Sequence, residues 1–72
     1  MVDVNKLKKT IAERGMTIEE VAEKIHVNKS TFYRKLSRNG EVFSVKEANA
    51  IMHCLSLSAS EATSIFFASV VA

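Results

Sequence analysis

The sequence predicts a small all-α domain of five helices, and three observations lead to that fold class. The 72-residue chain contains no proline and only two glycines, so little in it would interrupt helical backbone. Five positions carry a helix-start signature, in which a capping Ser, Thr, Asp or Asn is flanked by two apolar residues that can pack across it. Each start is followed by apolar residues three or four positions apart, a spacing that places them on one helix face.

The first helix is expected to have Asp3 as its N-cap. Val4, Leu7 and Ile11 recur at helical spacing behind it, so they predict the face that is buried. Gly15 is expected to end the helix, because glycine suits the left-handed backbone found at helix C-termini.

The second and third helices are separated by only three residues. The second is predicted over about Ile18 to Ile25, behind a capping box of Thr17 and Glu20. The third is predicted over about Lys29 to Ser37, with Asn28 as its cap. A turn this short holds two short helices at a steep angle, as in a helix-turn-helix motif. The residues expected to be buried in these helices and their turn are Val21, Ala22, Ile25, Val27, Phe32 and Leu36.

The fourth helix is predicted over about Val45 to Leu55 and the fifth over about Ala59 to Ala68. Both follow a Ser-x-x-Glu capping box, which begins at Ser44 and at Ser58 respectively. The polar segment before the fourth helix contains an Asn-Gly pair at positions 39–40, which is typical of a turn. Their expected buried residues are Ala48, Ile51, Met52, Leu55, Ala62, Ile65 and Phe66.

The start and outer face of the third helix are polar and contain no acidic residue. From Lys29 to Arg38 the chain carries four basic residues and no Asp or Glu, although its net charge is only +2. A helix N-terminus adds unpaired N–H groups and a positive dipole end. A helix fits the DNA major groove, where Arg or Lys can bond guanine and Asn can bond adenine. The pattern therefore favours DNA binding over the alternative, an ordinary solvated helix face.

Residues 16–40 resemble the helix-turn-helix of the Cro and lambda-repressor-like family. Their sequence is MTIEEVAEKIHVNKSTFYRKLSRNG. The whole chain is similar to small phage repressors and Cro-like regulators, including the tail segment ATSIFF at residues 62–67. The resemblance implies a five-helix, usually dimeric regulator that binds operator DNA. Two residues depart from the family pattern: His26 stands where glycine is usual in the turn, and Ile18 stands where a phosphate-contacting Gln is frequent.

The resemblance also implies which residues contact DNA. The implied base contacts are Asn28, Lys29, Ser30, Tyr33 and Arg34, of which Tyr33 could instead contact phosphate. The implied phosphate contacts are Thr17, Thr31, Ser37, Arg38, Ser44 and Lys46. We expect a sequence-specific transcriptional regulator, of the phage or prophage Cro-like repressor type, that binds double-stranded operator DNA.

The C-terminal helix and tail, residues 59–72, are nearly devoid of charge. One helix face can bury Ile65 and Phe66, but Phe67, Val70 and Val71 cannot all point into the same core. Either the tail folds back on the domain, or it forms a homodimer interface, expected to contain Ile65, Phe67, Val70 and Val71. A two-fold dimer would place two recognition helices about 34 Å apart and would require a palindromic operator. The alternative function is a protein-interaction module of antitoxin or antirepressor type, which docks a partner on this apolar helix.

Composition excludes several other classes of protein, and we expect one domain over residues 1–72. A single cysteine cannot form an internal disulfide and is typical of a reducing compartment, so we expect a cytoplasmic protein. No apolar run is long enough for a transmembrane helix, and the N-terminus lacks a signal-peptide pattern. Two histidines and one cysteine are too few for a closed zinc site, and no catalytic motif is present. We therefore expect no metal, cofactor, small-molecule ligand or enzymatic activity.

Overall fold

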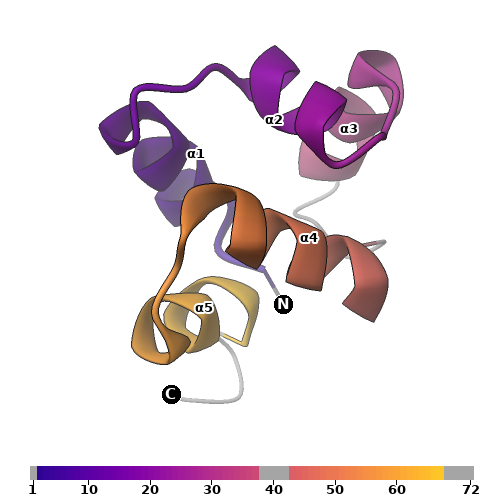
Figure 1. Ribbon diagram of the computed structural model, residues 1–72. Coiled ribbons are helices and arrows are strands. Elements are labelled where there is room, and N and C mark those ends of the chain that lie inside the picture. Colours follow the sequence, from indigo (N-terminus) through magenta and orange to yellow (C-terminus); the bar gives the residue numbers. More distant parts are fainter. Residues whose placement is uncertain (1, 38–42, 68–72) are drawn as a thin grey trace.

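Five α-helices and no strand make up the part of the chain that the computed structural model describes, residues 2–37 and 43–67. The helices are α1 (Val4–Glu13), α2 (Ile18–Lys24), α3 (Lys29–Ser37), α4 (Val45–Leu55) and α5 (Ala59–Phe66). In Figure 1, α4 lies between the α2–α3 pair on one side and α5 on the other. The predicted fold class is confirmed. The Asn-Gly pair at positions 39–40 lies outside the described residues.

The helix starts are held by the predicted caps. The Asp3 carboxylate accepts a hydrogen bond from the Lys6 N–H at 3.0 Å, and the Asn28 side-chain oxygen accepts one from the Ser30 N–H at 2.8 Å. Complete capping boxes begin α2, α4 and α5 at Thr17, Ser44 and Ser58. Two helix ends differ slightly from prediction: α2 stops at residue 24 and α5 at residue 66, each with the next residue as its C-cap.

The predicted buried face of each helix contributes to one core. α1 buries Val4, Leu7 and Ile11 as expected, and Thr10 joins them with its hydroxyl donating to the Lys6 carbonyl at 2.8 Å. The other buried apolar residues, all predicted, are Val21, Ala22, Phe32, Leu36, Ile51, Leu55, Ala62, Ile65 and Phe66. Other residues predicted to be buried are only partly so and pack against the margin of this core: Ile25, Val27, Ala48 and Met52.

The expected interface role of Ile65 is wrong. Its side chain is completely buried in the core of a single chain, and its carbonyl accepts a hydrogen bond from the Asp3 N–H at 2.7 Å. The reason is helical periodicity, since Ala62, Ile65 and Phe66 share the inward face of α5. Phe67, by contrast, is 57% exposed. Val70 and Val71 lie outside the described residues.

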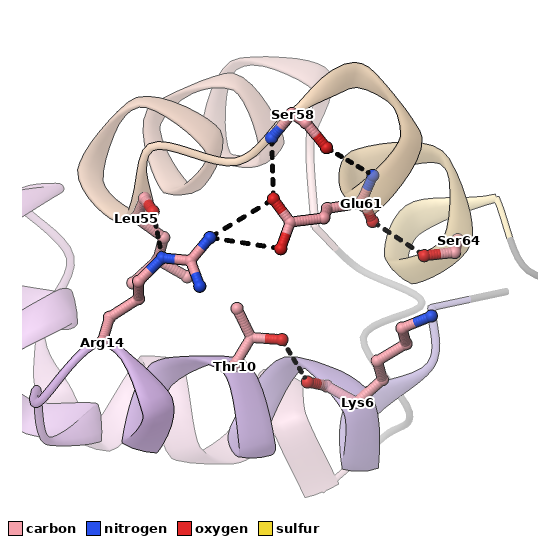
Figure 2. Close-up of polar contacts among 7 residues, drawn as sticks. All are labelled: Lys6, Thr10, Arg14, Leu55, Ser58, Glu61 and Ser64. Carbon is pink, nitrogen blue, oxygen red and sulfur yellow. Dashed lines mark hydrogen bonds and ion pairs between the residues drawn. The ribbon is translucent and has the colours of Figure 1, made fainter.

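Arg14, which follows α1, joins three helices through one guanidinium group (Figure 2). Its Nε donates to the Leu55 carbonyl, at the last residue of α4, over 2.9 Å. Its terminal nitrogen pairs with the Glu61 carboxylate in the first turn of α5 at 3.2 Å. The same carboxylate accepts the Ser58 N–H at 3.0 Å, so one carboxylate completes a capping box and binds Arg14. None of the helices in the described ranges is long and apolar enough to cross a membrane.

Candidate nucleic-acid interface

The turn between α2 and α3 places the two helices through a left-handed residue. His26 has a φ of 60°, which fits its position where the family that this motif resembles usually has glycine. Its N–H donates to the Glu23 carbonyl at 3.1 Å, and the next N–H, of Val27, donates to the Ala22 carbonyl at 2.9 Å. These two bonds form a Schellman motif, which ends α2 and redirects the chain within four residues.

The side chains of α3 divide into one buried face, one outer face and two flanks. Phe32 and Leu36 are buried, with 0% and 3% of their surface exposed. At 3.6 residues per turn, Ser30, Arg34 and Ser37 lie on the opposite, outer face, and all three are exposed. Lys29 and Tyr33 lie on the flank toward α2, and Thr31 and Lys35 on the flank toward α4. Within the described residues, the outer face of α3 therefore carries no acidic side chain.

The flank toward α4 is closed by an ion pair. The Lys35 ammonium group contacts the Glu47 carboxylate, and both side chains are less than one-fifth exposed. The ammonium also lies 6.0 Å from the centre of the Phe43 ring. Burial alone would raise the pKa of Glu47, but hydrogen bonds from Lys35 and from the Ser44 N–H outweigh it, so the pKa is lowered. Lys35 thus ties α3 to α4. Because its charge is paired with Glu47, Lys35 is not available to bind phosphate, although it belongs to the basic run from Lys29 to Arg38.

The flank toward α2 carries a second contact that sequence reasoning missed. The Tyr33 hydroxyl donates to the Glu19 carboxylate at 2.9 Å, and both residues are exposed. The pKa of Glu19 is lowered, first by a hydrogen bond from its own backbone N–H and then by the Tyr33 hydroxyl. The hydroxyl hydrogen of Tyr33 is therefore already used, and a phosphate contact from this residue would have to break that bond.

The hydroxyl groups expected to contact phosphate differ in what they can donate. Thr17 and Ser44 use their oxygens to accept the N–H groups of Glu20 and Glu47, and within residues 2–37 and 43–67 their own hydroxyl hydrogens remain free. Ser37 instead donates its hydrogen to the Arg34 carbonyl at 2.8 Å. The N-cap hydroxyls of α2 and α4 are therefore better placed to bind phosphate than the hydroxyl at the end of α3.

The start of α4 lies beside the turn of the motif. A hollow of 380 Å³ is lined by Ile25, His26 and Val27 on one side and by Ser44 and Lys46 on the other. Lys46 is exposed in the first turn of α4. The fold therefore brings the two expected phosphate contacts of α4 next to the helix-turn-helix.

The other expected DNA contacts are partly accessible. Asn28 and Lys29 are exposed, but the side-chain oxygen of Asn28 already caps α3, which leaves its NH₂ group as the free donor. Thr31 is only half-exposed. Arg38 lies outside the described residues. In residues 2–37 and 43–67, no group of three or more His, Cys, Asp or Glu side chains could hold a metal ion.

Comparison with known proteins gave one match. A family model described as the Cro/C1-type HTH DNA-binding domain matches residues 6–64, which includes all of α2, α3 and α4. No curated protein and no solved structure matched the chain.

Proposed function

Because the chain belongs to the Cro/C1-type helix-turn-helix family of DNA-binding domains, we propose that it is a sequence-specific transcriptional repressor of the phage Cro-like type. The observation that carries this proposal is the outer face of α3. Ser30 and Arg34 project away from the core opposite Phe32 and Leu36, and no acidic side chain interrupts them in the described residues. A helix with such a face suits the major groove.

In this proposal, α3 enters the major groove and the neighbouring helix starts hold the phosphate backbone. Arg34 and Lys29 bond guanine edges, and Asn28 donates from its free NH₂ group. Thr17 and Ser44 donate their free hydroxyl hydrogens to phosphate oxygens, where the positive dipole ends of α2 and α4 add attraction. Repression would follow when the bound operator overlaps a site that polymerase needs.

We further propose that the repressor acts as a homodimer on a palindromic operator. Support comes from an apolar groove of 160 Å³ between the start of α4 and the end of α5, lined in part by Phe43, Val45, Met52 and Phe67. Val45 is 80% exposed and Phe67 57% exposed, which is unfavourable for large apolar side chains in water. A two-fold contact over this groove would cover both.

The test of base reading compares Arg34→Ala with Lys46→Ala. Sites are first selected from a random pool of DNA duplexes, and each variant is then measured on the selected site and on its single-base changes. Arg34→Ala should weaken binding by about 1–3 kcal/mol and relax preference at one base pair. Lys46→Ala, a matched loss of one positive charge, should weaken binding to all sequences and reduce the salt slope by about 1.

A result in which both variants weaken all sequences equally would make Arg34 a phosphate contact and remove its role in reading bases.

A salt titration on random DNA separates DNA binding from the alternative of a protein-interaction module. Steep weakening between low and physiological salt is expected of DNA binding. A wild-type chain that binds no duplex at low salt would contradict the repressor proposal and favour the interaction module.

A further inference from the structure

A carboxylate borders the surface of α3 that the proposed function directs toward DNA. Glu19, in the first turn of α2, accepts the hydrogen bond of Tyr33 on the adjacent flank of α3. Both side chains are exposed. An acidic group at this border repels phosphate and lowers affinity for every sequence, unless it meets a hydrogen-bond donor on the DNA.

The direction of the Tyr33 hydrogen bond decides what this pair can bind. A carboxylate only accepts, and the single hydroxyl hydrogen of Tyr33 is donated to Glu19, so the phenolic oxygen offers only lone pairs to a further partner. The two side chains together therefore present acceptors and no donor. Phosphate oxygens are also acceptors, so the pair cannot bond the DNA backbone.

In the major groove, the only donors are the amino groups of cytosine and adenine. The adenine amino group lies beside the N7 acceptor, which would face the second acceptor of the pair, whereas cytosine has no acceptor on its own edge. Building on the proposed function, we propose that Glu19 and Tyr33 form an acceptor pair that selects cytosine through its N4 amino group at the α2 side of each half-site.

Two further observations support this assignment. The hydrogen bonds to Glu19 lower its pKa, with a smaller contribution from the positive charge of Lys29, so the carboxylate is ionised at neutral pH. Lys29 is exposed in the first turn of α3, on the same flank as Tyr33. A cationic donor beside an acceptor pair matches the edge of a C·G base pair, in which the cytosine amino group adjoins the guanine acceptors.

The experiment selects binding sites for the wild-type chain, Glu19→Gln and Glu23→Gln from the same random duplex pool. Wild type should retain cytosine at one position of each half-site, and replacing that base should weaken binding about tenfold. Glu19→Gln should shift this position toward adenine, because an amide can both accept from N6 and donate to N7. Glu23→Gln removes the same charge from the same helix and should keep the wild-type base preference.

The Tyr33→Phe substitution tests the hydroxyl separately. Tyr33→Phe leaves the charge of Glu19 intact, so cytosine discrimination should fall severalfold while the salt slope stays as in wild type. The pair can also be checked without DNA, because Tyr33 is the only tyrosine and the chain has no tryptophan. Its pKa is raised by the hydrogen bond to Glu19, and absorbance titration should find it lower in Glu19→Gln.

The outcomes distinguish this inference from the function on which it rests. If wild type selects a defined site and Glu19→Gln keeps the same base at every position, Glu19 acts only as a charge and the inference is overturned. The same holds if the titration of Tyr33 is unchanged in Glu19→Gln. If wild type selects no site at all, the repressor proposal itself fails.

Discussion

In the described part of the chain, α1, α2 and α4 each end at a residue with left-handed backbone, and the three residues differ in how well their side chains suit it. Gly15 has a φ of 71°, His26 of 60° and Ser56 of 53°. At each of them, the residue's own N–H and the N–H of the next residue donate the two hydrogen bonds of a Schellman motif. The sequence predicted Gly15 from its residue type, and the family pattern pointed to His26. Nothing in the residue type of Ser56 predicts a positive φ, which follows from the abrupt turn between α4 and α5.

His26→Gly should stabilise the free protein. A non-glycine residue in the left-handed region carries a steric cost that glycine avoids, because glycine has no Cβ atom. Glycine does, however, lose more conformational entropy on folding. We expect a net gain of about 0.5–1 kcal/mol in the free energy of unfolding, measured by urea denaturation. His53→Gly, in the exposed last turn of α4, is the matched control and should lose up to about 1 kcal/mol. Equal losses in both variants would mean that the His26 side chain makes a compensating contact.

Helix starts and buried faces were predictable because both depend on residues within four positions of one another. The contacts that lock the helices together were not. Arg14 reaches Leu55 and Glu61, which are 41 and 47 positions away, and Lys35 reaches Glu47, 12 positions away. These pairings depend on the angles between helices. For the same reason the sequence could not show that Lys35, one of the four basic residues from Lys29 to Arg38, pairs with Glu47.

The link between α1, α4 and α5 should make stability depend on acid pH. The pKa of Glu61 is lowered, first by the Ser58 N–H and then by Arg14. A carboxylate whose pKa is lowered by folding stabilises the protein above its ordinary pKa of about 4.3, and this contribution is lost as the pH falls through the folded value. Glu61→Gln should therefore melt at a lower temperature than wild type at neutral pH, and the difference should shrink below about pH 4.

Arg14→Lys is the companion variant, because it keeps a positive charge near Glu61 but lacks the planar fork that also bonds the Leu55 carbonyl. It should lose about 1 kcal/mol at neutral pH, and part of that loss should persist in acid, since the Leu55 bond does not titrate. A melting difference between wild type and Glu61→Gln that is constant from neutral to acid pH would rule out a stabilising role for the ionised carboxylate.

At the scale of the whole molecule, α3 buries one face in the core and directs the opposite face, proposed to bind DNA, toward solvent, while the apolar groove borders both the core at Phe66 and the proposed phosphate contact Ser44. Phe32 and Leu36 anchor α3 from behind, which leaves its outer face exposed for the proposed contact with DNA. The groove is formed where the start of α4 meets the end of α5. Val45 and Phe67 in this groove are exposed, so apolar area remains open to solvent in the part of the chain that the structure describes.

Phe67→Asp tests whether a second copy covers that area. An ionised carboxylate in an apolar contact is unpaired, so the variant should weaken dimerisation by about 2 kcal/mol or more, roughly a thirtyfold change in the dissociation constant. Sedimentation equilibrium should find dimers for wild type and monomers for Phe67→Asp at the same concentration. Ser60→Asp, exposed at the opposite end of α5, adds the same charge away from the groove and should remain dimeric.

The monomeric Phe67→Asp variant should still recognise a single half-site. It should lose its preference for the spacing of a palindrome, because that spacing is read only when two copies of α3 are held one DNA turn apart. An unchanged mass for Phe67→Asp would remove this groove from the interface.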